Sequence, residues 1–503
     1  MLEVQEIILH PYSLACLLFI FVTKWFFFNS ARNKNLPPSP LKIPVVGNLL
    51  QLGLYPHRSL QSLAKRHGSL MLLHLGSAPT LVVSSADGAR EILRTHDVIF
   101  SNRPDSSIAR RLLYDYKDLS LAPYGEYWRQ MRSICVAQLL SSKRVKLFQS
   151  IREEETALLL QNVELFSSRS LQVDLSELFS ELTNDVVCRI SFGKKYREGD
   201  GGRKFKKLLE EFGAVLGVFN VGDFIPWLGW INYLTGLNAR VEWVFTELDR
   251  FLDEVIEEFQ AKRVAVNEDK MNFVDVLLEI QKNSTDGASI GRDSIKAIIL
   301  DMFAAGTDTT FITLDWTMTE LIMSPKVMEK AQAEVRSVVG DRRVVQESDL
   351  PRLHYMKAVI KEIFRLHPAA PVLVPRESLE DIIIDGYNIP AKTRIYVNVW
   401  GMGRDPKLWE NPETFEPDRF VGSSIDFKGQ DFELIPFGSG RRSCPAIIFG
   451  IATVEIALAQ LLHSFDWELP PGIKAQDIDN TEAFGISMHR TVPLHIVAKP
   501  HFN

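Results

Sequence analysis

The stretch that decides the fold is Pro436-Phe437-Gly438-Ser439-Gly440-Arg441-Arg442-Ser443-Cys444-Pro445-Ala446. Two turn glycines precede one cysteine, a cation stands two residues before it, and an apolar run over 447–462 follows. This order predicts a loop that leads into a helix N-terminus, where unpaired N–H groups and the helix dipole would lower the pKa of the Cys444 thiol. The sequence therefore predicts a nucleophile or a metal ligand, although a buried structural cysteine is the commoner use of this residue.

The same residues form a longer pattern, Phe437-x-x-Gly440-x-Arg442-x-Cys444, which resembles the haem-binding signature of the cytochrome P450 family. The resemblance implies that the Cys444 thiolate is the axial ligand of the iron of haem b, iron protoporphyrin IX. It also implies that Arg442 pairs with a haem propionate, because a guanidinium binds a carboxylate through two bonds. Ala446 departs from the pattern, since the family usually has glycine there, and we expect haem binding to survive the added methyl group.

The composition is that of a large globular protein. The chain has 503 residues, 46% of them hydrophobic and 24% charged, with a formal net charge of −6. Neither a basic surface nor a charged tail is indicated, so nucleic acid is not an expected partner. The four cysteines, Cys16, Cys135, Cys188 and Cys444, are widely spaced, which argues against a disulfide framework and favours a reducing compartment.

The N-terminal region carries a long apolar run. Residues 7–28 are almost uniformly apolar and about long enough to span a bilayer. Two glutamates precede the run, whereas Lys24, Arg32 and Lys34 lie at or beyond its end. This charge placement favours a signal anchor over a cleaved signal peptide or a core helix, and it places the body of the protein in the cytosol.

We therefore expect two parts, an anchor at 1–31 and a catalytic domain at 32–503. The domain begins with a proline-rich, extended hinge at 32–48. This hinge resembles the one that follows the anchor of microsomal members of the family. The resemblance implies a single-pass protein of the endoplasmic reticulum membrane, in contact with membrane lipid.

Helical patterns dominate the rest of the chain, and short β-rich runs interrupt them. The expected class is mainly α with small β-sheets, and the resemblance implies the cytochrome P450 fold with an N-terminal transmembrane anchor. The expected helices include 141–166, 241–264 and 325–339, and the expected hairpin-like strand pairs are 70–75 with 80–84 and 382–389 with 393–399.

Trp128 and Arg132 stand four residues apart in an expected helix and so share one face. On its own, this spacing is more often that of an amphipathic surface pair. The spacing also resembles the family's WxxxR element, which implies that both side chains bind a haem propionate. Arg376 is a further propionate partner by the same resemblance.

The expected central helix, 295–322, is apolar on both sides of a small polar patch, Ala305-Gly306-Thr307-Asp308-Thr309-Thr310. Glycine and threonine weaken a helix locally, so we expect a bulge or a kink there rather than a helix start. The patch resembles the family's oxygen-activation element. The resemblance implies that Asp308 and Thr309 supply and position protons, while Ala305 and Gly306 leave room for O₂ and substrate.

Glu362 and Arg365 form an i,i+3 pair. Such a pair is usually exposed and contributes little to stability. It resembles the family's ExxR element, which implies a buried pair that is joined by Arg419 and braces the cysteine loop.

The segment 212–230 is rich in aromatic and aliphatic residues and is broken by glycines and a proline. It is either a core loop or a lid that rests on the membrane and admits apolar substrates. Trp227 and Trp230 suit a membrane interface.

The resemblance extends from the anchor to the C-terminus. The resemblance is strongest to plant microsomal A-type members of specialised metabolism, because of the residues at 123–129, 304–310 and 436–442. It implies a monooxygenase that uses O₂ and electrons from NADPH–cytochrome P450 reductase to hydroxylate or epoxidise a small apolar terpenoid, alkaloid or phenylpropanoid/coumarin. No strand–GxGxxG–helix unit supplies the electrons internally. The pocket residues implied are Ile298, Met302, Ala305, Ala369, Val372, Leu373, Phe484 and Ile486.

Two other functions remain open from the sequence. The same fold could catalyse oxidative coupling or rearrangement without net oxygen insertion, although an intact Asp308 and Thr309 argue against the peroxide-rearranging type. The chain could also be a haem-binding protein without catalysis. The identity of the substrate and the atom attacked depend on pocket shape, which the sequence does not give.

Overall fold

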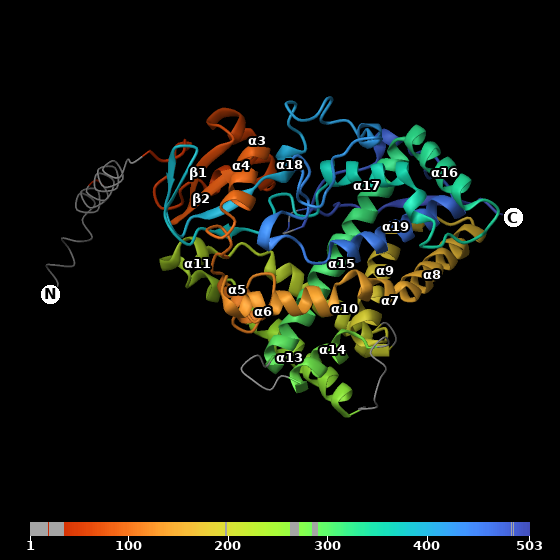
Figure 1. The fold of residues 1–503 in the computed structure, drawn as a ribbon, viewed down its shortest axis with the longest axis horizontal. Coiled ribbons are helices and arrows are strands. Elements are labelled where there is room, and N and C mark those ends of the chain that lie inside the picture. The colour runs from red at the N-terminus through yellow and green to blue at the C-terminus, as the bar shows by residue number, and fades with distance from the viewer. Residues whose placement is uncertain are drawn as a thin grey trace.

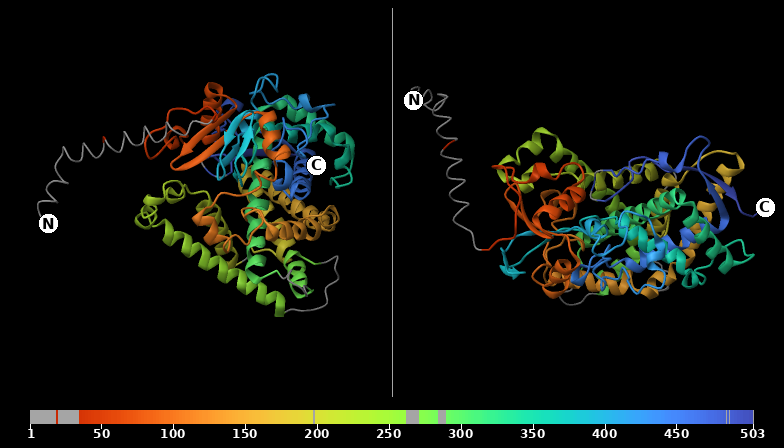
Figure 2. Two further views of the ribbon diagram at one scale, coloured as in Figure 1. Left: turned by 60° about the vertical axis from the view of Figure 1, so that its left-hand side comes forward. Right: turned by 90° about the horizontal axis from the view of Figure 1, so that it is seen from above.

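The computed structural model describes residues 19, 35–196, 199–261, 271–283, 290–483, 485 and 487–502, without the side chains at 199–204. The anchor predicted at 1–31 lies outside this description except for Phe19. The described part is mostly helical with small sheets, as predicted, and Figure 1 shows β1 and β2 at one end of the body and α16 at the other. Figure 2 shows the same separation from two further directions.

Helices make up most of the described chain. The helices are α3 (Pro56–His67), α4 (Ala86–Arg90), α5 (Ser107–Leu112), α6 (Glu126–Ile134), α7 (Ser142–Leu147), α8 (Gln149–Ser168), α9 (Leu175–Phe192), α10 (Gly199–Leu216), α11 (Val221–Phe224), α12 (Ile231–Leu234), α13 (Leu237–Ala261), α14 (Phe273–Asn283), α15 (Arg292–Met323), α16 (Pro325–Val339), α17 (His354–Leu366), α18 (Val399–Met402) and α19 (Ile447–Ser464).

The strands are short and form three small sheets. One sheet has the order β1-β2-β7-β4, a second has β3-β9-β8, and β5 pairs with β6. The strands are β1 (Leu70–Leu75), β2 (Ala78–Val83), β3 (Val173–Asp174), β4 (Arg376–Glu377), β5 (Ile382–Ile384), β6 (Tyr387–Ile389), β7 (Arg394–Val397), β8 (Phe465–Glu468) and β9 (His495–Pro500).

The long helix α15 runs through the middle of the body (Figures 1 and 2) and packs against α9, α17 and α19. Among the described residues, α15 and α19 are each long and apolar enough to cross a membrane, and a bent pair, 205–224 with 226–234, also qualifies if it counts as one span. However, 56% of the apolar stretch of α15 and 61% of that of α19 are buried inside the fold. Both helices are therefore apolar because they form the core.

The expected helix boundaries hold best where a proline marks the start. α16 has the predicted bounds, with Pro325 at its first turn. The helix expected over 141–166 is instead two helices, because Phe148 adopts φ −90° and ψ 12° between α7 and α8. The helix expected over 241–264 begins earlier, at Leu237, and its last three expected residues lie outside the described chain.

The expected interruption of α15 is not a bulge, since the helix is continuous α over its whole length. The hydroxyls of Thr307, Thr309 and Thr310 donate to carbonyls four residues earlier, at 2.5–3.0 Å. These bonds supplement the backbone ladder and do not replace it. The small residues therefore give this helix an open face without breaking it.

The strand pairs also differ from expectation. β1 and β2 form the predicted hairpin, with Gly76 at φ +60° in its turn. The run 382–389 is itself a hairpin, because Asp385 and Gly386 adopt positive φ and form a tight turn. β7 therefore pairs in parallel with β2 and antiparallel with β4, and not with the run before it.

Candidate functional site

The loop before α19 turns tightly on two glycines. Gly438 and Gly440 have φ angles of +67° and +69°, a region that favours glycine. A Cβ on Gly440 would lie 2.0 Å from the carbonyl oxygen of Leu93, so no side chain fits there. The loop closes where the Cys444 N–H donates to the Phe437 carbonyl at 2.9 Å. The two glycines thus place the cysteine just ahead of α19.

The charge state of Cys444 differs from the expectation. Burial raises the pKa of its thiol, and this outweighs the Ala446 N–H and the Arg132 guanidinium, which both lower it. Ala446 is the N-cap of α19, so the expected helix-start effect exists but is weaker than desolvation. The expected low thiol pKa is therefore wrong for the free side chain. Among the described cysteines, Cys135 and Cys188 are buried, whereas Cys444 is part-exposed.

The polar patch of α15 lies beside α19. A Cβ on Gly306 would lie 4.0 Å from the Phe449 ring, so the two helices meet closely at the patch. Ala305 and Thr309, one turn apart, are exposed although α15 is mostly buried on both sides of the patch. This exposed face and the part-exposed Cys444 mark where a bound group and substrate would lie.

Arg442 and Trp128 form a stacked unit next to the cysteine loop. The buried Arg442 guanidinium donates to the backbone carbonyls of Ser101, Leu119 and Ala122 at 2.5–3.4 Å. Its carbon Cζ lies 4.2 Å from the centre of the Trp128 ring. Trp128 Nε1 donates to the Leu119 carbonyl at 3.0 Å. The same backbone segment thus holds both predicted side chains.

Arg132 and Arg376 reach the loop from two other elements. Arg132 of α6 donates to Ser443 Oγ at 3.3 Å, and Arg376 of β4 donates to the Ser439 carbonyl at 2.7 Å. The Nη1 of Arg376 is buried and has no hydrogen-bond partner within the described chain. A buried guanidinium N–H without a partner indicates that an acceptor is missing.

Arg103 belongs to the same group, and sequence reasoning missed it. It donates to the carbonyls of Ser120, Val374 and Pro375 at 2.6–2.9 Å. Burial lowers the pKa of Arg103 to about 10. A single arginine before a proline carried no sequence pattern that would have revealed this contact.

The four arginines carry more positive charge than their surroundings neutralise. Burial, followed by repulsion from the neighbouring arginines, lowers the pKa of Arg376 to about 9 and that of Arg442 to about 8. Asp97 and Asp118 act in the opposite direction but do not offset this effect. The cluster is therefore suited to an anionic group.

Asp308 binds a C-terminal segment and not the residue beside it. One carboxylate oxygen accepts a bond from the Ser487 hydroxyl, and the other lies 3.0 Å from His489 Nε2. The Thr309 hydroxyl donates at 2.7 Å to the carbonyl of Ala305 in its own helix. Sequence reasoning missed Ser487 and His489, because Asp308 and Ser487 are 179 positions apart.

Three of the eight expected pocket residues lie on α15. Ile298 is buried, Met302 is part-exposed and Ala305 is exposed, so exposure increases towards the polar patch. Leu373 adopts φ +53°, and its Cδ1 lies 3.7 Å from the Cβ position of Gly438 in the cysteine loop. The other expected residues are Ala369 and Val372, which are part-exposed, and Phe484 and Ile486, which lie outside the described residues.

Known proteins match the chain over almost its whole length. The family model Cytochrome P450 matches residues 37–496. The chain belongs to the cytochrome P450 family. Cytochrome P450 71AP13 of Prunus mume is 55% identical over 98% of this chain and 96% of its own, and cytochrome P450 736A117 of Prunus mume is 52% identical over 98% and 97%. A zebra fish cytochrome P450 solved with progesterone has a TM-score of 0.77 at 25% identity, over 88% of this chain and 99% of its own.

Membership of the cytochrome P450 family makes the protein a monooxygenase whose cofactor is protoporphyrin IX haem. The arginine cluster fits this cofactor, because haem carries two propionates. Among the described residues no acceptor meets the buried Nη1 of Arg376, and burial lowers the pKa of Arg442, so an anion would stabilise both side chains. The part-exposed Cys444, which two turn glycines precede, suits an iron ligand.

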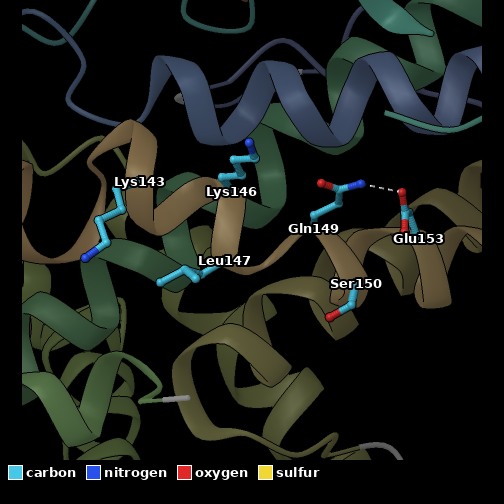
Figure 3. Close-up of a pocket in the computed structure, with 6 residues that line it drawn as sticks. All are labelled: Lys143, Lys146, Leu147, Gln149, Ser150 and Glu153. Carbon is cyan, nitrogen blue, oxygen red and sulfur yellow. Dashed lines mark hydrogen bonds between the residues drawn. The ribbon is translucent and has the colours of Figure 1, made fainter. Parts of the chain in front are cut away.

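A surface hollow of about 480 Å³ lies over α7 and the start of α8 (Figure 3). Gln149 donates to Glu153 across one side of it at 2.8 Å. Lys143 and Lys146 give it a cationic rim. None of the predicted haem or substrate residues lines this hollow, so it is a surface feature separate from the candidate active site.

Glu362 is fully buried, and two arginines bind it. Arg365, one turn later in α17, donates to both carboxylate oxygens at 2.7 Å. Arg419 Nε donates to one of these oxygens at 3.1 Å. Arg365 also donates to the carbonyls of Pro412 and Thr414 at 2.6 and 2.9 Å. The three side chains therefore tie α17 to the segment that leads to the cysteine loop.

We expect Glu362→Ala to lower the free energy of unfolding by about 3–5 kcal/mol, because the buried Arg365 and the part-exposed Arg419 would lose their carboxylate. Denaturant unfolding of the purified holoprotein measures this, and haem content per chain should fall with it. Glu329→Ala removes an exposed carboxylate of α16 and is the matched control, with an expected change below about 0.5 kcal/mol. Equal unfolding midpoints for the two variants would contradict the brace.

Proposed function

We propose that the protein inserts one oxygen atom of O₂ into a small apolar specialised metabolite, such as a terpenoid, an alkaloid or a phenylpropanoid/coumarin. The observation that carries the proposal is the apolar face of α15, where Ile298, Met302 and Ala305 lead to the open patch beside α19, the helix that follows Cys444. An apolar wall with few polar groups suits such ligands. Norfluorocurarine oxidase of Strychnos and tabersonine/lochnericine 19-hydroxylase of Catharanthus roseus, each 47% identical to this chain, support this substrate class.

Five residues would hold the haem. Cys444 would be the axial ligand, and Arg132, Arg376 and Arg442 would bind the propionates. Trp128 would join them by moving its one donor, Nε1, from the Leu119 carbonyl to a propionate. Metal coordination removes a thiol proton outright, so the raised pKa of the free Cys444 thiol is compatible with this role. The bound haem supplies the chemistry that activates dioxygen. Arg376 is the strongest propionate candidate, because its buried Nη1 has no acceptor in the part of the chain that the structure describes.

The polar patch of α15 would deliver protons and leave volume for O₂ and substrate. Asp308 would supply protons, and the Thr309 hydroxyl would position them at the open face of the helix. Ala305 and Gly306 would leave room for O₂ and substrate, because neither projects more than a methyl group. The Thr309 hydroxyl now donates to the Ala305 carbonyl, and rotation about χ1 would free it.

We further propose that electrons come from NADPH–cytochrome P450 reductase, since the family generally uses a separate redox partner. The cationic hollow with Lys143 and Lys146 supports a docking face for an acidic partner. α7, which carries both lysines, packs against α19, and Cys444 precedes α19 by three residues. An electron arriving there would reach the sulfur through the contact of α7 with α19.

We propose a single-pass anchor in the endoplasmic reticulum membrane at 1–31, with the catalytic domain in the cytosol. Exposed aromatic residues favour the lid and argue against the core loop for this segment, because Trp227 is 65% and Trp230 is 56% exposed. The same segment is tied to the hinge side of the domain, where the Ser77 N–H donates to the Phe224 carbonyl at 2.8 Å. The lid would therefore face the membrane that holds the anchor.

Microsomes that carry this protein and a reductase should oxidise a member of a terpenoid, alkaloid and coumarin panel. With isotope-labelled O₂, mass spectrometry should find one labelled oxygen atom in the product. Cys444→Ser should abolish the product and the red-shifted Soret band of the reduced carbon monoxide complex, because the thiolate ligand is lost. Cys188→Ala is the control and should keep both. An unlabelled product would contradict oxygen insertion, and a retained band in Cys444→Ser would remove Cys444 as the ligand.

Thr309→Ala should keep the haem spectrum but divert NADPH electrons to hydrogen peroxide. We expect the fraction of electrons that reach product to fall by about tenfold, because one positioned proton donor is lost. NADPH, peroxide and product are measured together with the panel compound that is turned over. Thr313→Ala is the matched control, since Thr313 lies one turn further along and bonds the Thr309 carbonyl at 2.8 Å. Unchanged coupling in Thr309→Ala would count against the relay.

The protein without residues 1–31 should still bind liposomes through the lid. Changing both Trp227 and Trp230 to serine in this shortened protein should reduce sedimentation with vesicles, because the exposed indole rings would no longer enter the interface. Leu165→Ser on α8, a similarly exposed apolar residue, is the control. If the shortened protein does not sediment with vesicles at all, the lid proposal fails and the segment is a core loop.

A further inference from the structure

The contacts of Asp308 come from a C-terminal hairpin, of which the structure describes residues 481–483, 485 and 487–491. Its base is closed by two backbone bonds, from the Thr491 N–H to the Thr481 carbonyl at 2.9 Å and from the Ala483 N–H to the His489 carbonyl at 2.8 Å. Two more bonds hold it to the core: the Met488 N–H donates to the Ala369 carbonyl at 3.0 Å, and Trp316 Nε1 donates to the Met488 carbonyl at 2.8 Å.

A buried ion pair fixes the other side of the hairpin. Glu482 is 3% exposed and accepts from His57 Nε2 and Arg58 Nε, both at 2.8 Å. These two partners lower the pKa of the Glu482 carboxyl to about 2, although burial opposes them. The described residues of the hairpin are therefore tied to the core on two sides, which places Ser487 and His489 beside Asp308.

Ser487, His489 and Asp308 form a closed triangle. The Ser487 hydroxyl donates to Asp308 Oδ2, His489 Nε2 lies 3.0 Å from Asp308 Oδ1, and Ser487 Oγ lies 3.1 Å from His489 Nε2. Both carboxylate oxygens are thus engaged by donors, and the donor on Oδ1 is a group that can release a proton. Asp308 and His489 are each about one third exposed, so the pair is not sealed in the core.

The charges around His489 favour its protonated form. Burial lowers the pKa of the imidazole. The bond to Asp308 and the charges of Asp308 and Asp315 raise this pKa, and together they outweigh burial, so the net shift is upwards. Arg490, the next residue of the hairpin, is paired with Asp315 at 3.6 Å and donates to the Asp479 carbonyl at 2.8 Å. The Asp308 carboxyl that faces the imidazole thus favours a proton on His489.

We propose that His489 resupplies the proton that Asp308 gives up during oxygen activation, and that Ser487 holds the carboxylate in place for this transfer. The proposal rests on the proposed role of Asp308 as proton donor. His489 acts through Asp308 and is a positioning and proton-supplying residue outside the reacting atoms.

The step is a proton transfer alone. The N–H bond at His489 Nε2 breaks and an O–H bond forms at Asp308 Oδ1, so the imidazolium becomes imidazole and the carboxylate becomes a carboxylic acid. Water then returns a proton to the imidazole. No electron moves and no other reactant is needed, and a separation of 3.0 Å allows direct transfer.

The test compares one variant that cannot release a proton at position 489 with one that cannot accept a proton at position 308. His489→Gln keeps an N–H donor for Asp308 but cannot titrate, whereas Asp308→Asn removes the acceptor. The full-length holoprotein is assayed with reductase, NADPH and O₂ and no added organic substrate, and the formation of water from O₂ is obtained from oxygen consumed minus peroxide released. Rates are measured in H₂O and D₂O, and His495→Gln, an exposed histidine on β9, is the control.

We expect His489→Gln to lower water formation by about tenfold and to enlarge the solvent isotope effect, while the haem spectrum stays unchanged. His495→Gln should behave as the wild type. An unchanged rate and isotope effect in His489→Gln, with a slow Asp308→Asn, would overturn this proposal alone. If Asp308→Asn is also unaffected, the proposed role of Asp308 fails as well, and with it the supply by His489.

A second readout does not depend on turnover. In the diamagnetic carbon monoxide complex of the reduced protein, labelled histidine gives an imidazole NMR resonance that His489→Gln removes and thereby assigns. Asp308→Asn should lower the pKa of His489, because it removes the neighbouring charge. A pKa that does not respond to Asp308→Asn would overturn the pairing.

Discussion

The burial of three arginines, Arg103, Arg376 and Arg442, beside the cysteine loop is the constraint on which the site depends. Each buried cation costs several kcal/mol unless it is paired. Arg103 and Arg442 recover part of this cost by donating to backbone carbonyls, so the loops that offer those carbonyls must keep their shape. The remaining positive charge is available to an anion. Binding of the haem propionates would therefore stabilise the folded protein as well as complete the site.

The segment around Leu119 connects this cluster to α15. The Leu119 carbonyl accepts bonds from Trp128 and Arg442, and the N–H groups of Leu119 and Ser120 donate to Asp301 at 2.6 and 3.2 Å. Burial and the neighbouring Asp118 raise the pKa of Asp301 to about 7. The folded chain then binds more protons than the unfolded chain from about pH 4 to 7, so this group costs stability as the pH rises through that range. The hydrogen bonds that Asp301 accepts offset the cost.

Local patterns predicted the elements that local chemistry determines. The two glycines and the cysteine gave the loop before α19, the proline gave the start of α16, and i,i+3 spacing gave the Glu362–Arg365 pair. The sequence did not reveal Arg103 or His489, because their roles come from contacts between distant segments. The same limit explains why the pairing of β7 was predicted wrongly, because its partner β2 lies over three hundred residues away. The raised thiol pKa of Cys444 was missed because burial is a property of the whole fold.

The three aspartates of α15 show how the distant contacts are organised. Asp301, Asp308 and Asp315 stand seven residues apart, close to two helical turns, so they share one face. Asp301 holds the segment at 119–120, Asp308 holds the hairpin, and Asp315 accepts from Ser176 at 2.5 Å. A shift of α15 would strain all three attachments together. The acid that is proposed to deliver protons is therefore placed by the same helix face that fixes the arginine side of the site and the C-terminal hairpin, and neither side can move without the other.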